Sequence, residues 1–480
     1  MKYAKIIIPI IYLILSLIIS FNRVPFWDEA RAWLVSQNCN PLEFLSLMRL
    51  ECHFSLWYIA IFPFAKLDLF YPYSIYILNA VFAFISIYLL WNKSPFNIFQ
   101  KILITFGVPF LFLWGSVARC YSIGIMFLFL ALSLYKERFE KPYKYLVLLC
   151  LSAHTSVMAF IGSFFLLLVF LFENFKKKGF LKLFGIFILF NLLILLQIYD
   201  PNPDYLKQAP EMAFLRDFVW YLLNPIVLIS QYKIQSLLMT ILRLSVIITV
   251  FTYISYTIKN NKKTLFFIVS TYFSMVILFT FFYSGNFWHY FYFYLYFIVA
   301  IWILKIENKF PKFLNIMTTI ILIMFMFKGS LFIDSKLTTI NNSTSNLIAK
   351  EIQTNYKNKK LFCLDPWSDI APSALPYLKG IDIFDKYNQN RRSFESMRSQ
   401  IRFNREDFNP DEFVNFVEND SILLTTTSFL NHELKNPRRR FDEKSGIISF
   451  VGDKKIIEFI PYKFMEEICL WTYLIKFKQL

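Results

Sequence analysis

Long apolar runs recur along this sequence, and they restrict its fold more than any other feature. The first, Ile6–Phe21, follows two lysines, and further runs of similar length continue to about residue 332. A run of 18 or more apolar residues is a candidate transmembrane helix, because about 20 such residues span the hydrocarbon core of a bilayer. The chain is 57% hydrophobic and 20% aromatic, which is typical of a protein that crosses a membrane several times.

The first apolar run has two interpretations. A cleaved signal peptide would end in small residues of the A-x-A type. Here the run continues into Phe21, Asn22 and Arg23, which do not form such a site. We therefore interpret Ile6–Phe21 as an uncleaved first membrane helix.

Eleven membrane spans are expected in the first two thirds of the chain. They lie at roughly 6–21, 74–91, 102–117, 121–135, 145–157, 158–173, 180–198, 237–257, 264–283, 287–304 and 313–332. A twelfth apolar stretch, Phe54–Leu67, is shorter and suits a helix that lies at the membrane surface. With this stretch at the surface, all the basic clusters of the loops fall on one side, which the positive-inside rule makes cytoplasmic. The N-terminus is then cytoplasmic as well.

The charge distribution separates the tail from the membrane part. The basic excess behind the net charge of +17 lies in the short loops before residue 332, so it indicates membrane orientation and not nucleic-acid binding. After residue 332, "KNKKLFCLDPW", "SILLTTTSFL" and "GIISFVGDKKIIEFI" predict strands, and "DEFVNFVEND" predicts a short helix. The predicted fold is mostly α-helical: a polytopic bundle over residues 1–332, with a first outer loop at 22–73, and a small extracytoplasmic α/β domain at 333–480.

An acidic pair, Asp28–Glu29, stands in the first outer loop within "WDEARAWLVSQ", which we expect to be helical. Acids in the first turn of a helix interact favourably with its dipole, so the pair can be structural. A carboxylate next to hydrocarbon is also partly desolvated, which raises its pKa and suits it to acid–base catalysis. The residues alone leave both interpretations open.

Further polar candidates lie in segments expected at the outer face. They are Glu51 and His53 in "ECHFSLWY", Arg119 and Tyr121 in "GSVARCYSIGI", His154 in "LSAHTSVM" and His289 in "SGNFWHYFYFYLYF". An arginine at a helix end can bind phosphate, or it can simply reach the membrane interface. The histidines can bind phosphate, relay protons or join carboxylates around a divalent metal ion, although no metal-ligand spacing is visible.

The order of these motifs after a first membrane helix resembles the membrane glycosyltransferases of the GT-C class. The similarity is greatest to bacterial proteins of the PMT/ArnT-like type, which are glycosyltransferase family 39-like. Departures exist: Cys52 replaces a glycine, Phe54 and Ser55 replace a proline pair, and Trp288 replaces an arginine.

The resemblance implies a transfer reaction at the bacterial cytoplasmic membrane. A sugar would pass from a polyprenyl-phosphate donor to a lipid, glycan or protein acceptor on the extracytoplasmic side, with inversion at the anomeric carbon. Asp28 would be the catalytic base, with Glu29 as its alternative. The implied substrate-binding residues are Glu51, His53, Arg119, Tyr121, His154 and His289. The one candidate cofactor is a divalent metal ion, and no cofactor is certain.

Two other classes of function stay open at this stage. One is a flippase or transporter of a lipid-linked substrate, which would favour internal repeats and ionisable residues in mid-span. The other is a non-catalytic membrane protein of the same fold, which the altered motifs would suit.

Overall fold

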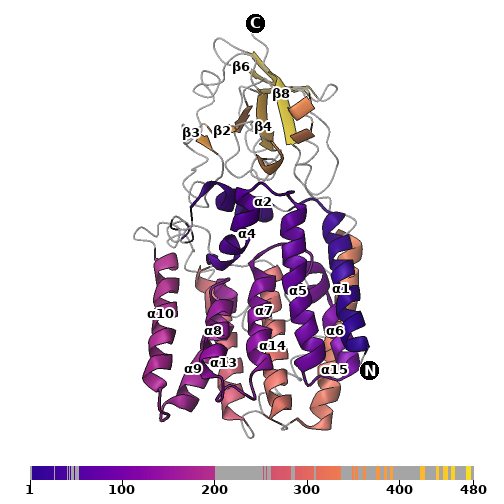
Figure 1. Ribbon diagram of the computed structural model, residues 1–480. Helices are drawn as coiled ribbons and strands as arrows, with labels where there is room; N and C mark the ends of the chain where they lie inside the picture. Colours follow the sequence, from indigo (N-terminus) through magenta and orange to yellow (C-terminus); the bar gives the residue numbers. More distant parts are fainter. Residues whose placement is uncertain are drawn as a thin grey trace. The chain divides into compact units, whose positions relative to one another are not determined.

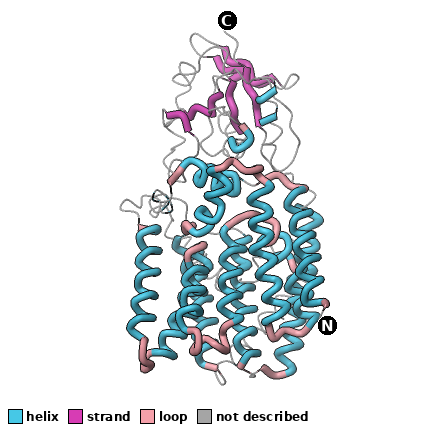
Figure 2. Tube along the Cα trace, in the orientation of Figure 1, coloured by secondary structure: helices cyan, strands magenta, loops and turns pink. Residues whose placement is uncertain are grey.

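The computed structural model describes most of residues 3–199 and 261–336, and short segments beyond them. Within the first range it leaves out residue 26 and most of 41–52, and within the second it leaves out 283–286 and 308–309. Between the two ranges it describes residues 252 and 256, and beyond residue 336 it describes 349–350, 352–354, 375–378 and eight strands. The described part is mostly helical (Figures 1 and 2).

The helices follow one another in this order. They are α1 (Ala4–Phe21), α2 (Trp27–Asn38), α4 (Leu56–Lys66), α5 (Tyr73–Lys93), α6 (Ile98–Phe106), the π-helix η1 (Pro109–Trp114), α7 (Cys120–Ser133), α8 (Pro142–Ala153), α9 (Val157–Asn174), α10 (Phe180–Ile198), α13 (Lys262–Ile277), the π-helix η4 (Leu278–Phe282), α14 (Phe287–Ile306), α15 (Lys312–Lys336) and the short 3-10 helix η5 (Leu375–Tyr377).

The chain divides into two compact units. Unit 1 comprises residues 1–19, 52–57 and 76–334, and unit 2 comprises residues 20–51, 58–75 and 335–480. The sequence-based division instead assigned the whole loop 22–73 to the membrane domain. In the structure most of that loop belongs with the tail, because α2 packs against η5.

Six helices in the described part are long and apolar enough to cross a membrane. They begin at Ala4, Tyr73, Val157, Phe180, Lys262 and Trp288, and each coincides within a few residues with an expected span. The apolar helices α4, α7 and α8 are shorter. The expected span at 237–257 lies almost entirely outside the described residues, so the total of eleven stays a prediction.

Two apolar segments of the chain are not single spanning helices in the structure: the expected span 102–117, and the stretch Phe54–Leu67 that was expected at the membrane surface. The span expected over 102–117 is divided into α6 and η1, because Pro109 lacks the N–H that would continue α6. Asn79 of α5 stabilises this irregular backbone by donating to the carbonyls of Trp114 and Gly115, both at 3.0 Å. Helix α4 has 11 residues and is therefore about 16 Å long, too short to cross a bilayer.

Side-chain caps fix where several helices of unit 1 begin. The side chains of Asn97, Ser156 and Asn261 accept hydrogen bonds from the backbone N–H groups of α6, α9 and α13, three residues further on. Such bonds satisfy donors that a helix leaves unpaired at its first turn. Gly179 precedes α10 with a φ of +96°, a conformation that favours glycine.

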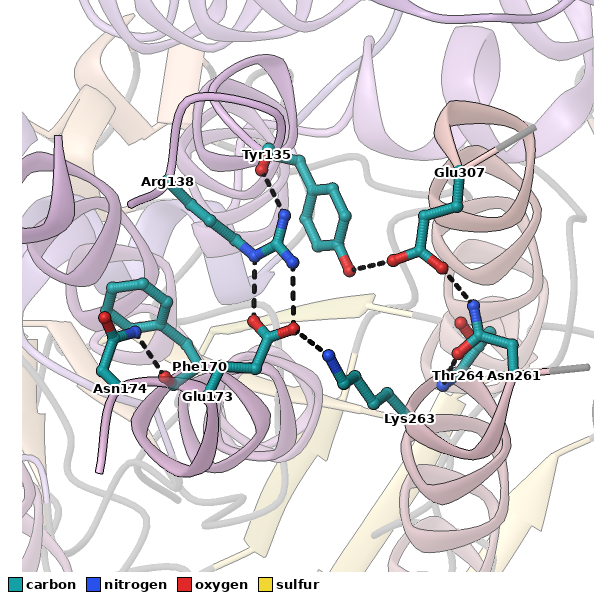
Figure 3. A network of polar contacts seen from close by, with 9 residues as sticks. All are labelled: Tyr135, Arg138, Phe170, Glu173, Asn174, Asn261, Lys263, Thr264 and Glu307. Atoms are coloured by element: carbon teal, nitrogen blue, oxygen red, sulfur yellow. Dashed lines mark hydrogen bonds and ion pairs between the residues drawn. The ribbon is translucent and has the colours of Figure 1, made fainter. Parts of the chain in front are cut away.

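One end of the helix bundle in unit 1 carries a network of polar contacts (Figure 3). Arg138, after α7, donates two hydrogen bonds of 2.9 Å to Glu173 at the end of α9, and Lys263 of α13 also contacts this carboxylate. Glu307, after α14, accepts from Tyr135 at 3.1 Å and from Asn261. The network therefore joins the termini of α7, α9, α13 and α14.

The described basic loops of unit 1 gather at this same end. Lys305 of α14 donates to Gln100 of α6 and to Asn315 of α15, at 2.8 and 2.6 Å. Asn92 of α5 donates to the Lys5 carbonyl of α1 at 3.2 Å. Because consecutive helices alternate in direction (Figure 1), the loops after α5, α7, α9 and α14 all lie at the end that holds the network.

Unit 2 contains two small sheets besides α2, most of α4 and η5. Strands β1 (Leu361–Cys363), β2 (Ile383–Asp385), β3 (Asn390–Arg392), β4 (Ile422–Thr426) and β8 (Thr472–Lys476) form a sheet of order β3-β2-β1-β4-β8, in which β1 is parallel to β2 and β4. Strands β5 (Arg439–Asp442), β6 (Ile447–Val451) and β7 (Ile456–Phe459) form an antiparallel sheet. The helix expected in "DEFVNFVEND" lies outside the described residues.

Candidate functional site

A cluster of one arginine, two histidines and a tyrosine lies at the end of unit 1 opposite the polar network. Arg119 is the N-cap residue of α7, and Tyr121 stands in the first turn of that helix. His53 precedes α4 and forms an isolated antiparallel bridge with Ser156, the N-cap residue of α9. His289 stands in the first turn of α14. Three chain segments therefore contribute to this cluster, and a fourth, the start of α9, holds His53 through the bridge to Ser156.

The contact between Arg119 and His53 indicates which ring nitrogen of His53 carries the hydrogen. A guanidinium only donates hydrogen bonds, so Nε2 of His53 must be the acceptor of the bond from Arg119 Nη2. The hydrogen of the neutral ring is then on Nδ1, which faces the Cys120 sulfur at 3.8 Å. His53 is therefore a neutral imidazole that orients the arginine.

Tyr121 is the centre of the cluster. Its ring lies edge-on to His53 and to His289, with centroid distances of 6.4 and 6.1 Å. The Arg119 guanidinium lies 5.5 Å from the centroid of the Tyr121 ring, a cation–π contact. The Trp288 indole donates to His289 Nε2 at 3.1 Å, which makes this second histidine a neutral ring with its hydrogen on Nδ1.

His154 occupies a different place from the other two described histidines. It follows α8, and its Nε2–H donates to the carbonyl of Phe190 in α10 at 3.0 Å, while Nδ1 accepts from Gln197 at 3.5 Å. Burial lowers the pKa of this imidazole, so its neutral form is favoured. Gln197 also accepts from the backbone N–H of Ser55 at 2.8 Å. His154 therefore connects the end of α8 to α10.

The acidic pair lies in unit 2, where its two members differ. The predicted helix is confirmed as α2, with Asp28 and Glu29 in its first turn. Both oxygens of Glu29 accept from the guanidinium of Arg23, one of them at 2.6 Å, and the side chains of this ion pair are at most 1% exposed. Asp28 is only partly buried. Glu29 is thus committed to a buried ion pair, whereas Asp28 lies nearer to solvent.

Sequence reasoning missed Tyr377, which neighbours this ion pair within unit 2. Burial raises the pKa of its phenol, and the negative charge of Glu29 raises it further. The Tyr377 ring packs against Tyr71 at 5.2 Å between centroids, and Tyr71 packs against Trp33 of α2 at 5.1 Å. No sequence motif links Tyr377 to a glutamate more than 300 positions earlier, so no signal in the sequence could have found it.

The structure thus brings together four of the eight expected site residues. His53, Arg119, Tyr121 and His289 form the cluster of unit 1. His154 lies apart in the same unit, Asp28 and Glu29 lie in unit 2, and Glu51 lies outside the described residues. Within the part of the chain that the structure describes, no three His, Cys, Asp or Glu side chains are arranged to hold a metal ion.

The chain was compared with protein-family models, with curated proteins and with solved structures. None of the three comparisons found a match. Its function is therefore argued from its own residues.

Proposed function

We propose that this protein is an integral membrane glycosyltransferase. It transfers a sugar from a polyprenyl-phosphate donor to an acceptor on the extracytoplasmic side, through a bundle of eleven spans and an extracytoplasmic α/β domain. The observation that carries this proposal is the cluster of Arg119, His53, Tyr121 and His289, a cationic and aromatic site at one end of an apolar helix bundle. Such a site suits a ligand that has a hydrocarbon chain and an anionic headgroup.

The donor phosphate would bind at Arg119. Guanidinium groups recognise phosphate oxygens through pairs of parallel hydrogen bonds, and His53 holds this one by the edge that bears Nη2. The phosphate would also benefit from the N-terminus of α7, where no side chain caps the first turn. Tyr121 and the two neutral histidines add polar and aromatic surface without adding a competing negative charge.

The orientation follows from the basic loops. Lysines and arginines collect at the cytoplasmic ends of membrane helices. In unit 1 they collect at the end with the Arg138–Glu173 network, so the end with the Arg119 cluster would be extracytoplasmic. A lipid-linked sugar in the outer leaflet presents its phosphate at that depth.

Asp28 is the better candidate for the catalytic base. Both oxygens of Glu29 already accept hydrogen bonds from Arg23, and the side chain is fully buried, so Glu29 is less accessible to an acceptor than Asp28. In the proposed step, Asp28 takes the proton of the acceptor hydroxyl or amine while that oxygen or nitrogen attacks the anomeric carbon. The bond from this carbon to the phosphate oxygen breaks, and polyprenyl phosphate leaves with the electron pair.

A transfer assay tests this function. Purified protein is mixed with radiolabelled polyprenyl-phosphate sugars and membrane extract, and Asp28→Asn and Arg119→Ala are compared with wild type. Loss of a general base lowers the rate by roughly 10²–10⁴-fold, so Asp28→Asn should abolish detectable transfer. Glu140→Gln, an exposed change in the loop after α7, should retain full activity. Absence of transfer by folded wild type with every donor would refute the proposal, as would movement of the lipid across vesicles without transfer.

A further inference from the structure

A cavity of about 520 Å³ opens among the helix ends at the basic side of unit 1. It lies where α1 begins, α5 ends and α6 begins. Its lining includes Lys5, Trp91, Phe96, Asn97, Phe99 and Lys101. This volume falls within the range of sites that hold organic ligands and exceeds what a simple ion requires.

Two lysines make this cavity cationic. Lys5 is exposed, whereas Lys101 is only 9% exposed and donates from Nζ to the Trp91 carbonyl at 2.9 Å. Neither ammonium forms an ion pair with a carboxylate in the described ranges. Burial and the positive charge of Lys5 lower the pKa of Lys101 to about 8. A bound anion would relieve both the repulsion and the poor solvation of this pair.

The walls of the cavity are apolar next to these charges. Ile98 and Phe99, which begin α6, are 42% and 52% exposed, and Trp91 and Phe96 are buried beside them. The positive end of the α6 dipole adds to the field of the lysines. A ligand that matches both surfaces carries a phosphate and a hydrocarbon chain. Basic pockets between membrane helices commonly bind phospholipid headgroups for this reason.

We propose that this cavity binds the phosphate of an anionic phospholipid, with Lys5 and Lys101 as phosphate ligands. The beginning of an acyl chain lies along Ile98 and Phe99. The site is independent of the Arg119 cluster, because it lies at the opposite end of the same bundle. The bound lipid belongs to the leaflet on the side of the basic loops. It has a structural role, because it contacts α1, α5 and α6 together.

Native mass spectrometry of the full-length protein tests this proposal. The protein is delipidated in detergent and then exposed to equal amounts of phosphatidylglycerol and phosphatidylethanolamine. Wild type should retain phosphatidylglycerol selectively. Lys5→Glu changes an exposed residue and leaves the bond between Lys101 and Trp91 intact, so it should reduce retention at least fivefold without unfolding the protein. Lys5→Arg should retain the lipid.

Lys178→Glu is the matched control, because Lys178 is an exposed lysine between α9 and α10 that does not line the cavity. It makes the same charge change and should leave lipid retention unchanged. Equal retention by wild type and Lys5→Glu would overturn the proposal, and so would equal binding of the two lipids. Displacement of phosphatidylglycerol by millimolar inorganic phosphate would overturn the assignment to a lipid headgroup.

Discussion

Arg23 and Glu29 form a two-pronged ion pair that is almost completely excluded from solvent, six residues apart at the start of α2. Removal of one partner from such a pair leaves an uncompensated buried charge, which costs about 3–5 kcal/mol. Glu29→Gln should therefore lower the thermal unfolding midpoint of the purified protein strongly. The double variant Arg23→Met/Glu29→Met should recover most of this loss, because it buries no charge. A midpoint for Glu29→Gln equal to that of wild type would show that the pair is not formed in solution.

Glu173 and Glu137 provide a comparison between a shielded and an exposed ion pair. The side chains of Arg138 and Glu173 are 11% and 5% exposed, whereas those of Lys141 and Glu137 are 51% and 46% exposed. Glu173→Gln should destabilise the protein by about 3 kcal/mol, because two cations lose their carboxylate. Glu137→Gln should have no measurable effect. Thermal unfolding in one detergent measures both, and equal effects of the two changes would contradict the network of Figure 3.

Gly162 of α9 leaves no room for a side chain. An added Cβ would lie 2.1 Å from a ring carbon of Tyr296, whose hydroxyl accepts from the Gly162 N–H at 3.1 Å and donates to the Met158 carbonyl. Gly162→Ala should therefore destabilise the protein by about 1–3 kcal/mol through overpacking.

Gly185 of α10 is the control, since nothing lies within 4 Å of its Cβ position. Gly185→Ala should be neutral or stabilise the protein by up to about 1 kcal/mol, because alanine favours helix. The thermal unfolding midpoints of the two single variants measure both effects. If Gly162→Ala were as stable as Gly185→Ala, α9 and α14 would not pack as described.

His154 makes stability depend on pH in a defined direction. Burial lowers its pKa in the folded protein, so the unfolded chain binds a proton more readily than the folded one. Its neutral form contributes stability above about pH 6.5, and this contribution is lost as the pH falls from there through the lowered folded pKa. Between pH 7.5 and 5, wild type should lose more thermal stability than His154→Gln. Parallel pH profiles for the two proteins would contradict this role.

The sequence predicted the long helices well because their signal is local. The expected spans at 180–198 and 287–304 correspond closely to α10 and α14, and "WDEARAWLVSQ" is helical as expected. The break between α6 and η1 was also visible in principle, because Gly107 and Pro109 stand inside an apolar run. The single span over 102–117 was predicted from hydrophobicity alone, which does not take account of a glycine and a proline within the run.

The arrangement of the candidate site could be predicted only in part. The motifs named Arg119 and His53 as separate candidates. These two residues are 66 positions apart in the sequence, and their contact depends on how α7 and α9 pack. The unequal roles of Asp28 and Glu29 could not be read from their adjacency. They follow from the ion pair that Arg23 forms with Glu29.

The composition of unit 2 has a consequence for biosynthesis. Residues 20–51 belong to the same compact unit as residues 335–480, yet the intervening chain must be made first. A ribosome that adds about 5–20 residues per second needs roughly 15–60 s to travel from residue 51 to residue 335. The segment that carries Asp28 and Glu29 therefore cannot complete its packing early, because its contact with η5 forms only after the chain between residues 51 and 335 has been made.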